Sequence, residues 1–532
     1  MPQVLIVELG SQYTQSIGRT LRELGFRSLI LPPDRAATWL AKHSEVVRGI
    51  ILSGGYASTY DAEMPAIPEE VLAIQKPILG ICLGHQYLAT KLGGKVQQVS
   101  EQQGYSDEEI EILEPGDPLF RHVTRRQNTV WMSHGDSVTT LPPGFRRTAR
   151  GEHCPVAAMS TEDGLRFGVQ FHPEVVETEC GKEVFRGFLE HCRAERDWSN
   201  ENQITAIEDD IRAAVPEDTE CLLGYSGGKD SSLLAALLGR VLGKRSHLLA
   251  IDHGALRKDE DKEIIANAGS LGYANDLWNF RIVYARDRFI PLMHAAGIDS
   301  EVKRKAFQPE YALTLAKEAA RIGAPMVAQG TLNTDLIESG RRGGAIIKTH
   351  HNTGLKIPIL NHHPLAEQLR RQGHEFLPQI HPLQELFKYE VEALARALGL
   401  PVGIVERKPF PGPGLFCRIF GISATWELIE TDRWATYVIE GIMSETGFDK
   451  EYSQLVVGLD GSKTTGVKGD KRAYGHAIVY HPLRTADFMT GYGVEVPVDI
   501  RRRIKREITQ HPDLVRVWSD EMNKPPATTE FE

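Results

Sequence analysis

Cys82 lies in a segment whose residue types favour a nucleophilic thiol. The string Gly80-Ile-Cys82-Leu-Gly84 follows an apolar run and precedes a stretch of helical character. A strand, a sharp turn and a helix around a central nucleophile form the thiol version of the G-x-S-x-G turn, whose small flanking residues permit the strained backbone. Because a cysteine after a strand is more often a small core residue, this interpretation depends on catalytic partners elsewhere in the chain.

His172 and Glu174, in the string Phe171-His-Pro-Glu174, are the candidate partners of this cysteine. A nucleophilic thiol needs a general base, and the base needs a group that orients it. We expect His172 to take and return the proton, and Glu174 to hold the imidazole in the required tautomer. A tetrahedral oxyanion needs preorganised N–H donors, and we expect Leu83, the residue after the nucleophile, to supply one.

A second chemical motif, Tyr225–Ser232, predicts a phosphate site. It lies between the apolar run Cys221–Gly224 and the helix-like run Leu233–Leu238. Glycines let the backbone approach a ligand closely, and the following helix N-terminus favours an anion. The motif lacks the spacing of a Walker A loop. Asp230 is the expected Mg2+ ligand, and the residues expected to bind ATP are Ser226, Gly227, Gly228, Lys229, Asp230, Ser231 and Ser232.

The elements that must position these motifs predict an α/β fold. Short apolar runs alternate with helical patterns in both halves of the chain, which indicates open sheets covered by helices. The phosphate motif follows the first strand of its sheet, where ligands bind in open α/β sheets. Beyond residue 400 a Pro- and Gly-rich segment precedes mixed helices and strands. The expected strands are Gln3–Val7, Gly49–Leu52, Pro77–Ile81, 221–225, 247–252 and Pro325–Gln329.

We therefore expect two open, mostly parallel α/β sheet domains and a smaller C-terminal α+β domain. The predicted bounds are 1–195, 200–402 and 403–532, with the polar stretch Arg193–Asn202 as the first linker.

Composition limits the class of protein. Hydrophobic residues make up 41% of the 532 residues and charged residues 25%, as in soluble globular chains. A net charge of −10 argues against a general nucleic-acid surface, so local basic pockets must hold anionic ligands. No apolar stretch reaches the roughly 20 residues of a membrane helix, and there is no signal-peptide pattern. The six cysteines show no C-x-x-C pairing, which fits a reducing cytoplasm.

The two motifs also resemble known families. Ser226–Ser232 resembles the SGGxDS signature of ATP pyrophosphatases, which cleave ATP between the α- and β-phosphates and activate a substrate as an adenylate. Cys82, His172 and Glu174 resemble the triad of class I glutamine amidotransferases, which hydrolyse glutamine to glutamate and ammonia. The resemblance implies that domain 1–195 is the amidotransferase, 200–402 the adenylating domain, and 403–532 a domain for dimerisation and nucleotide binding.

Longer strings, in the same order along nearly the whole chain, resemble the GMP synthase family. That resemblance implies a ligase that aminates XMP to GMP through adenylyl-XMP, converting ATP to AMP and pyrophosphate, with Mg2+ as cofactor, in a cytoplasmic homodimer. It further implies Gly55 as the second oxyanion donor. The implied XMP-binding residues are Arg257, Pro411, Gly412, Gly414, Lys524, Thr528 and Glu530. The matching strings are Leu9–Gln15, Leu52–Gly55, Trp131–Asp136, Ile251–Lys258, Gly330–Ser339, Lys348–Asn352, Pro409–Gly414, Gly469–Tyr474 and Lys524–Glu532.

Departures from the family pattern leave the acceptor open. The thiol triad matches throughout, and the phosphate loop differs at Lys229 alone. The other departures include Tyr56, Tyr389, Lys408, Thr529 and Phe531. One alternative is therefore a paralogous amidoligase that aminates a different nucleotide or nucleoside. A second alternative is a non-catalytic regulatory homologue, against which the intact triad argues.

Two further clusters could be taken for sites. The basic run Arg501–Arg506 is interpreted as a solvated helix face rather than a phosphate clamp. His350 and His351 are adjacent, and neighbouring side chains point to opposite faces of a strand. We therefore do not expect this pair to bind a metal, and we place it in the nucleotide region.

Overall fold

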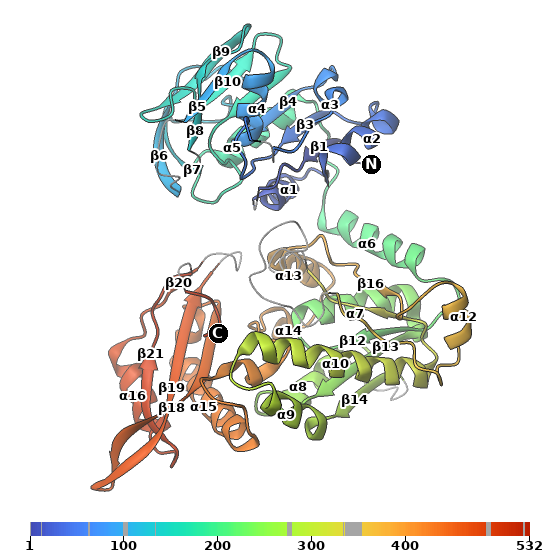
Figure 1. Ribbon diagram of the computed structural model, residues 1–532, viewed down its shortest axis with the longest axis vertical. Coiled ribbons are helices and arrows are strands. Elements are labelled where there is room, and N and C mark those ends of the chain that lie inside the picture. The colour runs from blue at the N-terminus through green and yellow to red at the C-terminus, as the bar shows by residue number, and fades with distance from the viewer. Residues whose placement is uncertain are drawn as a thin grey trace. The chain divides into compact units, whose positions relative to one another are not determined.

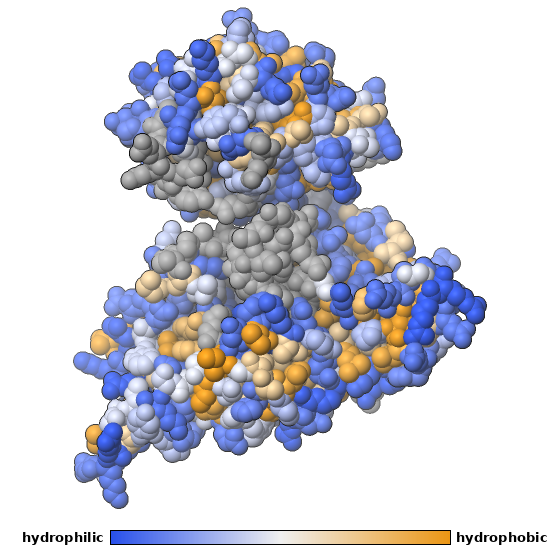
Figure 2. Space-filling model, in the orientation of Figure 1, coloured by the Kyte–Doolittle hydropathy of each residue, from blue (hydrophilic) through white to orange (hydrophobic). Residues whose placement is uncertain are grey.

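The computed structural model divides into two compact units, Met1–Asn202 and Gln203–Glu532, which are described separately (Figure 1). Hydrophilic side chains cover much of the surface of both units in Figure 2, with apolar residues gathered in places on the second. The structure describes residues 2–11, 13–61, 64–98, 105–133, 135–273, 279–332, 335, 354–485, 491–524 and 527–531.

The first unit is built on a nine-stranded mixed sheet. Its parallel strands are β2 (Ser28–Leu31), β1 (Val4–Val7), β3 (Gly49–Leu52), β4 (Ile78–Ile81) and β11 (Arg166–Val169), in that spatial order. Every residue of β1, β3 and β4 is buried, as expected of parallel strands covered on both faces. The sheet continues with antiparallel strands β10 (Ala158–Thr161), β9 (Phe145–Gly151), β6 (Tyr105–Ile112) and β7 (Gln127–Ser133).

Alternate residues of the parallel strands enter separate hydrophobic clusters, because successive side chains point to opposite faces. Val4 and Ile6 of β1 join one cluster with residues of α1 and α5, whereas Leu5 and Val7 join another with residues of α2, α3 and α4. These helices are α1 (Thr14–Glu23), α2 (Pro33–His43), α3 (Glu69–Ala73), α4 (Leu83–Lys91) and α5 (Gly181–His191). A separate antiparallel pair, β5 (Lys95–Gln98) and β8 (Asp136–Thr140), completes the unit.

The second unit begins with a five-stranded parallel sheet. Its spatial order is β14 (Phe280–Tyr284), β13 (Ser246–Asp252), β12 (Cys221–Gly224), β15 (Met326–Ala328) and β16 (Gln379–Ile380). The first strand in sequence, β12, is therefore central, and the chain continues to opposite sides of it, which creates a ligand crevice at its carboxyl end. The helices are α6 (Asn200–Ala214), α7 (Lys229–Leu242), α8 (Glu260–Ser270), α9 (Arg286–Ala295), α10 (Ser300–Ile322), α12 (Ala366–Arg371), α13 (Lys388–Ala397) and α14 (Val402–Val405).

The C-terminal part of this unit carries a second five-stranded sheet. A long hairpin of β18 (Gln454–Lys468) and β19 (Lys471–Arg484) forms its centre and projects from the unit in Figure 1. The remaining elements are β17 (Ile419–Phe420), α15 (Trp426–Glu445), β20 (Tyr492–Gly493), α16 (Val498–Ile508) and β21 (Leu514–Ser519).

The predicted fold class and the six predicted strands are confirmed. One hydrophobic cluster contains Leu222 of β12 and Phe289 of α9 together with Ile439 of α15 and Val457 of β18. The division at 402/403 therefore falls within one compact unit and stays a prediction. No helix of the described residues is long and apolar enough to cross a membrane.

The segment predicted as a linker contains the boundary between the two units. The backbone N–H of Arg27 donates to Asp197 at 2.9 Å, and the Trp198 ring lies under the Arg22 guanidinium. The earlier part of this segment is therefore packed on the first unit, while its end already belongs to helix α6.

Candidate active sites

Cys82 occupies a strained turn between β4 and α4. Its φ of 50° and ψ of −105° are unfavourable for a residue with a side chain. A Cβ on Gly80 would lie 2.5 Å from the Gly84 carbonyl carbon, and a Cβ on Gly84 would lie 2.5 Å from the Leu52 oxygen. Both glycines of the motif are therefore required by backbone contacts, and the local sequence holds the thiol in its turn.

His172 and Glu174 form a buried pair beside this thiol. The Nδ1–H of His172 donates to Glu174 Oε1 at 2.8 Å, and His172 is also hydrogen-bonded to Cys82. The backbone of His172 is held by two hydrogen bonds. Its N–H donates to the Trp131 carbonyl at 3.0 Å, and its carbonyl accepts from Thr178 Oγ1 at 2.7 Å. The structure thus brings the three predicted catalytic residues together, with His172 between Cys82 and Glu174.

The electrostatic environment favours a charged imidazole. Burial alone would lower the pKa of His172, but the negative charges of Glu174 and Cys82 and the hydrogen bonds to both raise that pKa to about 10. An imidazolium beside a sulfur stabilises a thiolate, which is the nucleophilic form of cysteine.

The two predicted oxyanion donors, the N–H groups of Gly55 and Leu83, belong to segments that pack against each other. Gly55 approaches the nucleophile turn so closely that a Cβ there would be 2.4 Å from both Leu83 Cδ2 and the Leu9 oxygen. Among the described residues, no group accepts a hydrogen bond from the N–H of Gly55 or of Leu83. Both N–H groups are therefore available to a ligand, and their role as oxyanion donors stays a prediction.

The phosphate loop follows β12 and starts α7. Gly227 has a φ of 69°, and a Cβ there would lie 2.9 Å from Ile264 Cγ1, so glycine suits this position. Ser226 Oγ lies 3.1 Å from Ser231 Oγ and accepts from Gly228 N–H at 3.3 Å. These internal hydrogen bonds tie the loop to the first turn of the helix.

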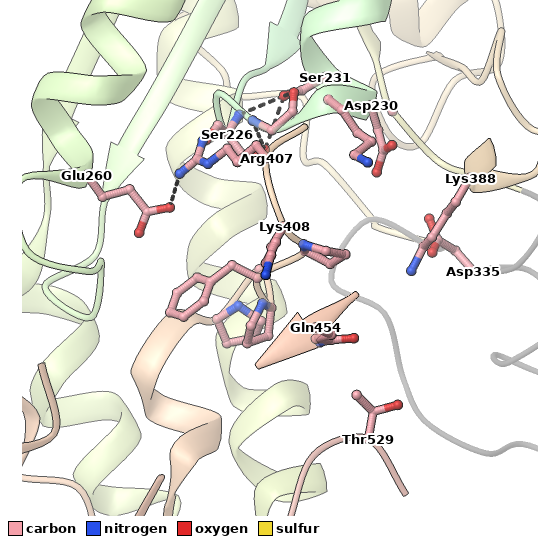
Figure 3. Close-up of a pocket in the computed structure, with 18 of the residues that line it drawn as sticks. Ser226, Asp230, Ser231, Glu260, Asp335, Lys388, Arg407, Lys408, Gln454 and Thr529 are labelled. Carbon is pink, nitrogen blue, oxygen red and sulfur yellow. Dashed lines mark hydrogen bonds and ion pairs between the residues drawn. The ribbon is translucent and has the colours of Figure 1, made fainter. Parts of the chain in front are cut away.

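A cavity of about 760 Å³ extends from this loop to the C-terminal tail (Figure 3). It connects two sets of predicted residues that lie between about 180 and 300 positions apart in the sequence. The predicted residues that line it are Ser226, Gly228, Lys229, Asp230, Ser231, Pro411, Gly412, Lys524 and Glu530.

Five predicted binding residues do not line the cavity: Gly227, Ser232, Arg257, Gly414 and Thr528. Ser232 is fully buried, with its hydroxyl 3.1 Å from that of Tyr225. Gly414 is needed for close packing, since a Cβ there would lie 2.1 Å from the Ala255 oxygen. Thr528 Oγ1 donates to the Glu530 carbonyl at 2.5 Å.

Arg257 supports the cavity wall from behind. Its guanidinium forms ion pairs with Glu260 at 3.4 Å and Glu440 at 3.5 Å, and it lies 4.9 Å from the centre of the Phe410 ring. Phe410 itself lines the cavity. Arg257 therefore acts on the loop 409–414 rather than on the cavity directly.

Asp230 has the environment of a metal ligand. Burial raises the pKa of its carboxyl to about 6, although Lys388 and Lys229 oppose that effect, and its Oδ1 has no hydrogen-bond partner. The described residues contain no group of three or more His, Cys, Asp or Glu side chains that could hold a metal. Asp230 and the nearby Asp335 nevertheless fit Mg2+, which is usually held by one or two carboxylates together with substrate phosphates.

Sequence reasoning missed several cavity residues. Figure 3 shows Asp335 and Lys388 on one side of the cavity, Arg407 near Ser226, and Gln454 toward the tail. Arg407 Nη1 donates to the Ser226 carbonyl at 3.4 Å, and its guanidinium forms an ion pair with Glu260. Asp335 belongs to the string Gly330–Ser339, which resembles the family, so the sequence could have identified it as a site residue. No local sequence pattern identifies Gln454 as a site residue.

The C-terminal tail is docked on the unit. Glu530 Oε2 lies 3.4 Å from Nε of Arg418, a residue that is 1% exposed. Lys524 Nζ donates to Thr529 Oγ1 at 3.1 Å, and both residues line the cavity. Phe531 packs on Phe420, with ring centres 5.3 Å apart. These contacts replace the solvated tail that chain ends usually form.

The other departures from the family pattern have different surroundings. The Lys408 ammonium lies 3.5 Å from the centre of the Tyr452 ring and donates to the Asp449 carbonyl, and Lys408 also lines the cavity. Tyr389 lines it as well and is stacked on Phe387. Tyr56, in the first unit, is 73% exposed.

The remaining candidate clusters add no site. The basic run Arg501–Arg506 lies on α16 and forms ion pairs with Glu445, Glu495, Glu507 and Glu521, which confirms a surface helix face. His350 and His351, with the string Lys348–Asn352, lie outside the described residues.

A strained thiol with a buried His–Glu pair, on an open α/β sheet, is the arrangement of an enzyme that transfers acyl groups through a thiol, and the second unit adds a cavity that begins at a loop rich in glycine and serine. Residues 5–192 match the family model described as glutamine amidotransferase class-I, and residues 441–531 match that of the GMP synthase C terminal domain.

Curated relatives match the whole chain. The glutamine-hydrolyzing GMP synthase of Lacticaseibacillus casei is 37% identical over 534 residues, covering 100% of this chain and 98% of the relative. That of Thermus thermophilus is 38% identical over 532 residues, covering 99% of this chain and 100% of the relative. The chain belongs to the GMP synthase family.

Proposed function

We propose that this protein is an AMP-forming ligase that transfers the amide nitrogen of glutamine to XMP. The products are GMP, glutamate, AMP and pyrophosphate. The observation that carries the proposal is the combination, in one chain, of the Cys82–His172–Glu174 triad with a cavity that joins a phosphate loop to the family's C-terminal tail. The full-length relatives named glutamine-hydrolyzing GMP synthase support it.

The first unit releases ammonia. The Cys82 thiolate attacks the glutamine side-chain carbonyl, and the N–H groups of Gly55 and Leu83 stabilise the resulting oxyanion. The His172 imidazolium gives its proton to the departing nitrogen, and Glu174 keeps the imidazole oriented throughout. The neutral imidazole then activates water, which hydrolyses the thioester to glutamate and restores the thiolate–imidazolium pair.

The second unit activates XMP. The purine C2 carbonyl oxygen attacks the α-phosphorus of ATP, and pyrophosphate leaves toward the loop of Ser226, Gly228 and Ser231. AMP is a better leaving group than hydroxide, so ammonia can then displace it at the purine carbon to give GMP. Ammonia must reach this carbon before bulk water converts it to ammonium.

Mg2+ would be held by Asp230 and Asp335 together with ATP phosphates, where it would neutralise the charge that develops on pyrophosphate. Lys229, Lys388 and Arg407 line the same cavity and add positive charge around the phosphates.

Lys524 and Glu530 are the proposed contacts to XMP. Their placement at the far end of the cavity from the phosphate loop fits one nucleotide bound opposite another. Pro411 and Gly412 line the same cavity. Because glycine has no side chain, the loop at Gly412 leaves room for a purine base. Arg257, Gly414 and Thr528 hold this wall and the tail in place.

We further propose a cytoplasmic homodimer that binds neither nucleic acid nor membrane. All six cysteines are free and buried, which fits a reducing compartment such as the cytoplasm. Exposed apolar side chains on the C-terminal sheet, among them Val467 and Tyr474 of the hairpin, offer a surface for a second copy. Light scattering in solution tests the dimer.

A second candidate function is amination of a different nucleotide. Lys408 and Thr529 depart from the family pattern and both line the cavity, where they could alter acceptor choice. Incubation with Mg-ATP, ammonium and a panel of purine monophosphates separates the two candidates. We expect AMP and pyrophosphate to appear with XMP. If another purine monophosphate yields them and XMP does not, the protein acts on that other acceptor.

A further inference from the structure

Asp136 is a buried acid of the first unit that the proposed glutaminase chemistry does not use. It begins β8 and is 7% exposed. Each carboxylate oxygen accepts one hydrogen bond, Oδ2 from Ser58 Oγ at 2.6 Å and Oδ1 from the Tyr60 hydroxyl at 2.9 Å. Within the described part of the chain, Asp136 forms no ion pair. Its side-chain partners there are two hydroxyls of a single loop.

That loop is the one that carries Gly55. Its start is fixed by packing, because a Cβ on Gly55 would lie 2.4 Å from the Leu9 oxygen. Tyr56 and Tyr60 are both largely exposed, at 73% and 63%, but the Tyr60 hydroxyl is held by Asp136. Ser58 is held by its hydroxyl to Asp136 and by its N–H to Asp61 Oδ2 at 2.8 Å. The loop that carries the Gly55 N–H is therefore anchored by packing at its start and, farther along, by Asp136 together with the turn that Asp61 closes.

Asp136 is in turn tied to the helix that carries the nucleophile. Gln86 Nε2 donates to the Asp136 carbonyl at 2.8 Å and to Gln170 Oε1 at 3.2 Å. Gln86 lies one turn after Cys82, and its N–H donates to the Cys82 carbonyl at 3.0 Å. A continuous set of hydrogen bonds thus runs from the nucleophile helix through Asp136 to the Gly55 loop.

We propose that Asp136 is a positioning residue of the glutaminase site, which fixes Gly55 relative to Leu83 through the hydroxyls of Ser58 and Tyr60. This inference rests on the proposed role of Gly55 and Leu83 as oxyanion donors. Such donors act only when held within about half an ångström of the productive geometry. Loosening the loop therefore reduces the rate of the chemical step more than it weakens glutamine binding.

Two variants test the role of the carboxylate in the full-length protein. Asp136→Ala removes the acceptor, and the double variant Ser58→Ala with Tyr60→Phe removes both donors while keeping the fold nearly unchanged. We expect each to lower kcat for glutamine hydrolysis by about tenfold or more, with little change in KM. Asp136→Asn should give an intermediate rate, because an amide can accept from one hydroxyl and donate to the other.

Asp117→Ala is the matched control. Asp117 is also a buried carboxylate of the first unit, and it accepts from the Ser160 hydroxyl and from Leu119 N–H at 3.0 Å. It also forms an ion pair with Arg146 at 3.3 Å. Those partners carry no proposed glutaminase role, so Asp117→Ala reports the cost of deleting a buried acid, with the loss of one ion pair in addition.

Alkylation of Cys82 by iodoacetamide forms no oxyanion, so its rate should be unchanged in the Asp136 variants, as should synthesis of GMP from ammonium. The inference is overturned if Asp136→Ala hydrolyses glutamine as fast as Asp117→Ala does, or if alkylation slows by the same factor as hydrolysis. Wild-type protein that hydrolyses no glutamine would instead overturn the proposed function, and this inference with it.

Discussion

The strained turn at Cys82 makes a prediction about stability that is separate from catalysis. Cys82→Gly and Cys82→Ala both lack the thiol and both abolish glutamine hydrolysis. They differ in strain, because a φ of 50° with a ψ of −105° is costly for alanine and accessible to glycine. Such a backbone conformation costs about 1–3 kcal/mol. The difference in unfolding free energy between the two variants therefore measures the backbone strain at position 82.

The expected magnitude follows from a matched site on the adjacent helix. Ala89 of α4 is fully buried in ordinary helical conformation. Changing it to glycine loses about 1 kcal/mol of helix propensity and about 0.8 kcal/mol of methyl burial. Glycine at position 82, the N-cap of α4, loses the methyl burial but avoids the interior helix-propensity loss. It gains about 2 kcal/mol of strain relief, so it should be close to neutral or stabilising relative to alanine.

The measurement is hydrogen exchange of α4 peptides in the full-length protein at increasing urea. In the Cys82→Ala background, Ala89→Gly should lower the unfolding free energy of the first unit by about 2 kcal/mol. Cys82→Gly, compared with Cys82→Ala, should lower it little or raise it. Equal destabilisation at the two sites would show that the turn stores no strain and would refute the reasoning.

Three further substitutions test the charges of the sites. Glu174→Gln removes a charge that raises the pKa of His172, so the imidazolium is lost at lower pH and the alkaline limb of the glutaminase pH profile should move down by at least about one pH unit. Asp230→Asn should abolish formation of AMP with either ammonium or glutamine, and its glutaminase should survive. Glu530→Gln breaks the contact to Arg418 and should raise KM for XMP about tenfold, or about 1.4 kcal/mol, in assays with ammonium.

Each of these results has a contrary outcome. An unmoved alkaline limb would mean that Glu174 does not set the charge of His172. If Asp230→Asn still forms AMP from ATP, Asp230 is not required as a metal ligand. An unchanged KM for XMP in Glu530→Gln would mean that the Glu530 carboxylate does not contribute to XMP binding. Wild-type activation of XMP, followed as pyrophosphate release, should itself decline as pH falls through about 6, because Asp230 must be ionised to hold a metal.

Sequence reasoning succeeded where one short segment determines the structure. Gly80, Cys82 and Gly84 lie within a single strand–turn–helix, so their types and spacing predicted the strained elbow. The phosphate loop is equally local, since β12, its glycines and the start of α7 are consecutive. Local strings thus predicted the strands, the strained turn at Cys82 and the fold class.

Features that depend on distant parts of the chain were harder to predict. Asp335, Arg407 and Gln454 reach the cavity from separate elements, and no local pattern places them beside the phosphate loop. Arg257 was assigned to the substrate site by resemblance, whereas its contacts to Glu440 and Phe410 place it behind the wall. A cation in a matching string has the right chemistry for a nucleotide, but tertiary packing decides which group it meets.

The central claim is that nitrogen freed at Cys82 is installed on a purine nucleotide activated by AMP transfer. Glutamine labelled at its amide nitrogen, supplied with XMP and Mg-ATP, tests this most directly by mass spectrometry of the nucleotide products. The account predicts labelled GMP from the wild type, with one AMP for each GMP, and none from Cys82→Ala unless labelled ammonium is added. Label that stays in glutamine or free ammonia, with no labelled purine from any acceptor, would contradict it.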